Sequence, residues 1–118
     1  MPDRRGQGRE AEDQAVEYLL EQGLTIVTRR FKCRVGELDI VAIDGETLAF
    51  IEVKQRLVPG SLPEESITKR KRELLHESAR EYLRKVDEPD RPYRLDLVAI
   101  DRQGIRYYRG ALSETWDM

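Results

Sequence analysis

VGELDIVAIDGETLAFIEVK, residues 35–54, is the stretch that decides the fold, because it holds two apolar strands joined at an Asp-Gly pair. Asp-Gly between two such runs is a strong signal for a β-hairpin. Three acids and a lysine nevertheless lie inside these strands, namely Glu37, Asp39, Glu52 and Lys54. Charged side chains are seldom buried unless they are paired. The stretch therefore predicts a central hairpin that also carries a functional site.

The elements around the hairpin follow the order α-β-β-β-α-β-β. The pattern predicts a helix at about 9–22, strands at 24–32, 36–43 and 47–54, a loop at 55–65, a helix at 66–86, and strands at 93–100 and 105–108. This order predicts one α/β domain over residues 1–118, with a mixed sheet flanked by helices. Residues 1–8 are expected to be flexible, and Trp116 is expected to cover the sheet edge.

Composition excludes several classes of protein. The chain has 118 residues with 1 cysteine and 1 histidine, which argues against an internal disulfide and a Cys/His zinc site. No apolar run approaches the length of a membrane span, and the charged start MPDRRGQGRE lacks the apolar segment of a signal peptide. A cytoplasmic protein is the simplest interpretation. The net charge of −2 means that nucleic-acid binding would need local basic patches.

The hairpin places its two central acids on one face. If Ile43 pairs with Glu46, then Asp39 faces Phe50, and Asp39 and Glu52 become diagonal neighbours, roughly 7–8 Å apart at the backbone. Two such carboxylates repel each other, and a bound Mg²⁺ or Mn²⁺ would remove the penalty. A lysine beside such a metal, here Lys54, suits phosphodiester hydrolysis. The alternative is a solvated sheet face on which Lys54 pairs with an acid.

Each helix carries one charged residue on its apolar face. Glu12 falls among the apolar residues of the first helix, so it is either a third acid at the metal site or a buried salt bridge or helix-start acid. Lys71 falls on the apolar stripe of the second helix. It either reaches a phosphate or a site carboxylate, or its long side chain snorkels past the core.

Basic residues cluster in RR (29–30), KCR (32–34), Lys54 with Arg56, and KRKR (69–72). These clusters predict contacts with nucleic-acid phosphates through Arg30, Arg34, Arg56 and Lys71; the alternative is a solvated charged face. Arg94 and Asp96 share a face of the strand at 93–100, where they either pair with each other or brace the site.

Five segments together resemble the YraN-like family. They are GREAEDQAVEYL, RVGELDIVA, FIEVKQR, SITKRKRELLHESAREYL and YRLDLVAI, in that order over most of the chain. The family is similar to archaeal Holliday-junction resolvases and, through them, to the PD-(D/E)XK nuclease superfamily. The resemblance implies a restriction-endonuclease-like core, a DNA rather than an RNA substrate, and a homodimer by analogy with resolvases.

The resemblance also implies roles for single residues. Asp39 and Glu52 would hold the metal, with the backbone carbonyl of Val53 as a further ligand. Lys54 would be the superfamily's catalytic lysine, and Glu12 would match the extra acid of the resolvase-like branch. Glu37 belongs to the Gly-Glu-x-Asp motif without a defined role, and Leu38 stands where the superfamily's name has proline.

Three functional hypotheses follow. The first is a metal-dependent endonuclease that hydrolyses phosphodiester bonds in DNA, branched or single-stranded. The second is a non-catalytic nucleic-acid-binding or adaptor module on a nuclease fold. The third is a protein-interaction domain with a structural ion network. Binding to nucleic acid that weakens steeply with salt would separate the first two from the third.

Overall fold

The computed structural model describes residues 4–113, with side chains from residue 9 onward. Its elements are α1 (Arg4–Glu21), β1 (Thr25–Cys33), β2 (Gly36–Asp44), β3 (Thr47–Gln55), the 3-10 helix η1 (Pro63–Ser66), α2 (Lys69–Lys85), β4 (Tyr93–Asp101) and β5 (Gly104–Tyr108). The expected order of helices and strands is confirmed. Helix α1 begins earlier than expected, and Trp116 lies outside the described residues.

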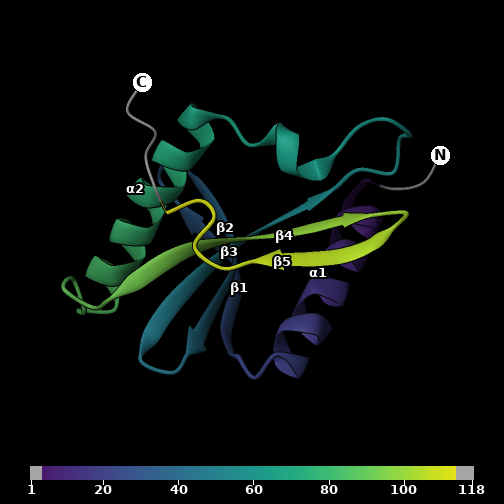
Figure 1. Ribbon diagram of the computed structural model, residues 1–118. Coiled ribbons are helices and arrows are strands. Elements are labelled where there is room, and N and C mark those ends of the chain that lie inside the picture. The colour runs from purple at the N-terminus through teal and green to yellow at the C-terminus, as the bar shows by residue number, and fades with distance from the viewer. Residues whose placement is uncertain (1–3, 114–118) are drawn as a thin grey trace.

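The strands form one mixed sheet in the order β1-β2-β3-β4-β5. Neighbours are antiparallel except β3 and β4, which are parallel. Parallel neighbours need a crossover connection, and α2 supplies it. Helices α1 and α2 cover opposite faces of the sheet (Figure 1). The result is an α/β protein with three layers and a five-stranded mixed sheet.

Each face of the sheet has its own apolar core. The core under α2 contains Leu38, Val41, Leu48, Phe50, Leu75, Ala79, Tyr82, Leu83, Leu95, Leu97 and Leu112. The core under α1 contains Ala11, Ala15, Leu19, Leu24, Ile40, Ala42, Ala49, Ile51, Val98 and Ile100. Because both faces are covered, the central strands are apolar on both sides. A charged residue inside them must therefore find a partner within the fold.

The register of the central hairpin differs from the expectation. Asp44 pairs with Thr47 and Ile43 with Leu48, so the two-residue loop is Gly45-Glu46 and not Asp44-Gly45. Gly45 takes φ +63°, at the first loop position, where a type II′ turn places glycine. An Asp44-Gly45 loop of type I′ would also require a positive φ at Asp44. The register therefore slides by two residues, which preserves the face that each side chain occupies.

The alternation of β2 breaks next to Asp39. Leu38 and Val41 both belong to the core under α2 although they are three residues apart, and Ile40 lies in the core under α1. The paired part of β2 and β3 starts at Ile40 opposite Ile51. Beyond that pair, Asp39 would lie opposite Glu52. The hairpin thus stops pairing at the point where its acids begin.

Candidate functional site

Asp39 and Glu52 come together where β2 and β3 stop pairing. A side-chain oxygen of Asp39, Oδ2, accepts a hydrogen bond from the backbone N–H of Val53 at 2.8 Å, in place of a strand-to-strand bond. Glu52 is 5% exposed, although its neighbours in β3 are apolar. Within residues 9–113, its Oε2 atom is buried and has no hydrogen-bond partner. A buried carboxylate oxygen without a partner is costly and marks a site where a ligand would be stabilising.

Two lysines face the other oxygen of Glu52. Lys54 Nζ lies 3.6 Å and Lys71 Nζ 3.5 Å from Oε1. Of the alternatives for Lys71, the structure shows a contact with a site carboxylate, that of Glu52. Lys54 reaches Glu52 from two residues along β3, and Lys71 reaches it from the first turn of α2. Helix α2 starts where it does because the Thr68 side chain caps the backbone N–H of Lys71.

The environment of Asp39 disfavours its charged form. Burial, and after it the charge of Glu52, raise the pKa of Asp39 from 3.8 to about 7. The hydrogen bond from Val53 lowers the pKa but does not offset these effects, and the charge of Glu12 adds to them. Two acids that oppose each other in a desolvated place are the setting in which a bound cation is stabilising.

Glu12 is buried and is held by arginines. Arg29 Nε lies 2.9 Å from its Oε1 and Arg30 Nε lies 3.1 Å from its Oε2, while Arg29 also pairs with Asp13 at 2.6 Å. Of the two expectations for Glu12, this geometry is the buried salt bridge. Alternation along a regular strand would send Arg29 and Arg30 to opposite faces of the sheet. Arg30 takes φ +55°, which turns both toward α1.

The acids do not form a three-carboxylate cluster. Over the described part of the chain, no group of three or more His, Cys, Asp or Glu side chains is placed to hold a metal ion. Asp39 and Glu52 remain as a pair beside the Val53 backbone. Mg²⁺ in proteins is often bound by one or two carboxylates, several waters and substrate phosphates, so this donor set suits it. The unpartnered Glu52 oxygen is the feature that fits such an ion best.

Arg94 and Asp96 pair with each other, and the second acid that Arg94 contacts is Asp44. Arg94 Nε contacts Asp96 at 2.9 Å and its Nη2 contacts Asp44 at 2.7 Å, at the hairpin end of β2. Asp96 is fully buried and also accepts bonds from Tyr107 Oη and the backbone N–H of Gly110. The group joins β2, β4 and β5, and in the register of β3 and β4 Asp96 lies opposite Ile51, the neighbour of Glu52. Of the two expectations, mutual pairing is the one seen.

The remaining residues with an expected role are spread over the surface. Glu37, Arg34 and Arg56 are exposed, and the backbone N–H of Arg34 bonds to the Glu81 carboxylate on α2. His76 is expected, from its position off the apolar stripe of the second helix, to be an ordinary surface residue. It is instead half-buried, with its ring nitrogens bonded to Tyr93 Oη and the backbone carbonyl of residue 113. These contacts join residues that are far apart in the sequence, so a local sequence pattern does not predict them.

Fold and site together define an α/β protein in which a buried acid, Glu52, and a half-buried acid, Asp39, lie beside two lysines where two central strands stop pairing. The description of the matching family is "Uncharacterised protein family UPF0102", and the match covers residues 11–100. The chain belongs to this family, which confirms the YraN-like resemblance at the family level. No helix in residues 4–113 is long and apolar enough to cross a membrane.

Similar proteins of this family occur in several bacteria. A UPF0102 protein of Persephonella marina is 38% identical over 105 residues, covering 88% of this chain and 90% of the relative. One from Nitrosomonas eutropha is 36% identical and covers 97% of this chain and 99% of the relative. One from Pseudomonas paraeruginosa is 43% identical over 101 residues, covering 82% and 79%. These relatives have about the length of the present chain, so the family similarity extends over nearly the whole fold.

Proposed function

We propose that this chain is a metal-dependent endonuclease with a restriction-endonuclease-like core that hydrolyses phosphodiester bonds in DNA, branched or single-stranded. The observation that carries the proposal is the buried Glu52, whose Oε2 atom has no hydrogen-bond partner within the described residues, beside Asp39 with its raised pKa. The α-β-β-β-α-β-β order of the fold supports it, as does the resemblance to the PD-(D/E)XK superfamily.

Asp39 and Glu52, with the Val53 carbonyl, would hold Mg²⁺ or Mn²⁺. When bound, such an ion supplies Lewis acidity and a more acidic water. The Val53 N–H fixes the Asp39 carboxylate at 2.8 Å, so this acid is already oriented. Lys54, 3.6 Å from Glu52, is placed to orient a water or to offset charge that develops on the phosphate. Lys71 would contact a phosphate of the DNA from the α2 side.

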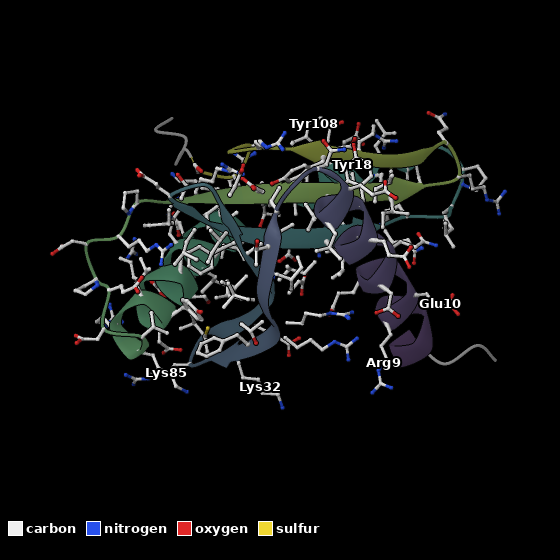
Figure 2. All side chains as sticks on the ribbon, turned by 90° about the horizontal axis from the view of Figure 1, so that it is seen from below. Arg9, Glu10, Tyr18, Lys32, Lys85 and Tyr108 are labelled. Carbon is white, nitrogen blue, oxygen red and sulfur yellow. The ribbon has the colours of Figure 1, made fainter. Side chains whose placement is uncertain are left out.

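DNA binding would rest on local basic groups, because the net charge is −2. Arg30, Arg34, Arg56 and Lys71 are the proposed phosphate contacts. Arg9, Lys32 and Lys85 project on one side of the molecule, from α1, β1 and α2 (Figure 2). Basic groups along such an edge would attract a nucleic acid backbone in a salt-dependent way. A homodimer would match the two-fold symmetry of a DNA junction and remains part of the proposal by analogy.

The test is cleavage of fluorescent branched and single-stranded DNA by the wild type, Asp39→Ala and Lys54→Ala, each with Mn²⁺ or Mg²⁺. We expect metal-dependent cleavage by the wild type and loss of it in both variants, while circular dichroism shows a retained fold. Asp44→Ala is the matched control, because Asp44 is an acid of the same strand outside the site. Undiminished cleavage by both site variants would overturn the proposal.

A second candidate function has one observation in its favour. Both lysines already pair with Glu52, and Glu12 is already held by Arg29 and Arg30, as in a self-contained ion network. A non-catalytic nucleic-acid-binding or adaptor module would need no more than this. DNA binding that is unaffected by Mn²⁺, without cleavage of any of the substrates, would favour this module over the nuclease.

A further inference from the structure

The loop after β3 exposes three large apolar side chains close to the candidate site. Leu57, Val58 and Leu62 are 45%, 67% and 46% exposed. The loop leaves the strand that carries Glu52, and Leu57 follows Lys54 by three residues. Side chains of this kind seldom gather at the end of one loop without a partner to cover them. Residues 57–62 are called the apolar tip below.

The apolar tip has a defined shape. The backbone N–H of Ser61 bonds to the carbonyl of Val58 at 3.3 Å, which closes a four-residue turn. Pro59 occupies the second position of this turn and Gly60, with φ +83°, the third. Proline followed by a residue of positive φ is the pattern of a type II turn. Proline and the turn bond restrict the backbone, so the apolar side chains are presented by an ordered projection.

Both ends of the apolar tip are tied to the sheet. The backbone N–H of Arg56 bonds to the carbonyl of Ile100 on β4 at 3.0 Å. On the other side, Glu64 of η1 pairs with Arg106 of β5 at 2.7 Å. In Figure 1 the teal loop that follows β3 extends past the sheet near the turn from β4 to β5. Because both of its ends are held, the apolar tip is restrained from moving away when it contacts another molecule.

Two arginines border the apolar tip. Arg56 and Arg102 line a hollow together with the tip. Within the described residues neither forms an ion pair with an acid, and the side chain of Arg56 bonds only to the backbone carbonyl of Gln55. Two nearby acids, Glu64 and Asp101, both pair with Arg106 rather than with Arg56 or Arg102. The apolar side chains of the tip are complementary to the faces of stacked bases, and the two arginines are complementary to the phosphates on either side.

We propose that the apolar tip is a wedge that inserts Leu57 and Val58 against a base where stacking in DNA is interrupted, as at a branch point. The inference rests on the proposed function and narrows its substrate to branched DNA. Insertion of aliphatic side chains between bases is a known way to kink or open a duplex. A second copy of this chain is a poorer occupant, because a stable protein interface buries roughly 800 Å² per partner and three side chains of this size supply only a fraction of that.

The test uses a four-way DNA junction with 2-aminopurine beside the branch, and a linear duplex of the same sequence, in EDTA so that no cleavage occurs. Wild-type protein is expected to raise the 2-aminopurine fluorescence and to bind the junction more tightly than the duplex. Leu57→Ser/Val58→Ser should lose the fluorescence rise and about tenfold in junction affinity, with duplex affinity unchanged. Leu20→Ser is the matched control, because Leu20 is 53% exposed on α1.

Several outcomes would overturn the wedge. They are an unchanged fluorescence rise and junction preference in the double variant, no fluorescence rise with the wild type, and a wild-type dimer that the double variant converts to a monomer in sedimentation. The proposed function is tested apart from the wedge by Mn²⁺-dependent cleavage of single-stranded DNA, which has no branch to open. If the double variant still cleaves single-stranded DNA and still prefers the junction, the wedge is overturned and the proposed nuclease function is retained.

Discussion

Replacing Asp39 by asparagine is expected to stabilise the metal-free protein at high pH. The folded chain raises the pKa of Asp39 from 3.8 to about 7, so the folded state holds this proton more tightly than the unfolded state. The contribution of Asp39 to stability therefore falls as pH rises from about 4 through about 7. At about 1.4 kcal/mol per pH unit, a separation of roughly three pH units corresponds to about 4 kcal/mol at pH 8.

Asparagine at position 39 removes this titration and keeps the acceptor for the Val53 N–H, which is 2.8 Å from the carboxylate in the wild type. Urea unfolding in EDTA from pH 4 to pH 8 measures the effect. Asp39→Asn should match the wild type at the acidic end and exceed its free energy of unfolding by an amount that grows toward pH 8, up to about 4 kcal/mol. A variant that is equally or less stable than the wild type at pH 8 would refute the reasoning.

Asp44→Asn is the control of opposite sign. Hydrogen bonding to Arg94 lowers the pKa of Asp44 from its ordinary value of 3.8. A carboxylate with a lowered pKa contributes stability above its ordinary pKa, and this contribution is lost as pH falls through the folded-state pKa. Asp44→Asn should therefore weaken the protein at pH 8, where Asp39→Asn strengthens it. The two substitutions remove the same charge from the same strand. A difference between their effects on the free energy of unfolding therefore reports the different surroundings of the two carboxylates.

The other predictions concern the fold. Arg94→Ala leaves the fully buried Asp96 without the guanidinium 2.9 Å away and should lower the free energy of unfolding by about 3–5 kcal/mol in urea, while Mn²⁺ affinity of the folded protein stays unchanged. Unchanged stability would mean that Asp96 does not depend on this ion pair. Gly45→Ala should lower stability by about 1 kcal/mol, because φ is +63° there; at Gly36, which also has open space for a methyl group but no positive φ, alanine should be tolerated. Equal effects at the two glycines would contradict the turn assignment.

Periodicity and turn signals suffice to predict the elements and their order. The apolar strands at 36–43 and 47–54 and the inward face of the helix at 9–22 correspond to β2, β3 and α1. The register of the hairpin is less accessible, because Asp44-Gly45 and Gly45-Glu46 are both plausible two-residue loops. From Ile40 to Asp44 the side-chain faces survive the error, since the shift is two residues. The expected nearness of Asp39 and Glu52 is also retained, whereas the break in alternation next to Asp39 is not predictable from the hairpin pattern.

Partners that depend on tertiary contacts are harder to predict. The pairing of Glu12 with both Arg29 and Arg30 depends on the positive φ of Arg30. Arginine does not favour a positive φ, so the sequence does not predict this conformation. The Asp96 network depends on Tyr107, which the fold brings across from β5. Helix periodicity does show that Glu12 points inward. What it meets there is decided by an irregularity in another strand.

The most direct test of the central claim is calorimetric titration of Mn²⁺ into wild-type protein and the Asp39→Ala and Asp44→Ala variants. A metal site at Asp39 and Glu52 predicts saturable binding by the wild type, loss of that binding in Asp39→Ala, and retention in Asp44→Ala. Such a result would explain why β3 buries a glutamate with an unpartnered oxygen. Absence of binding by the wild type, or equal binding by Asp39→Ala, would contradict the account and favour a self-contained ion network around Lys54 and Lys71.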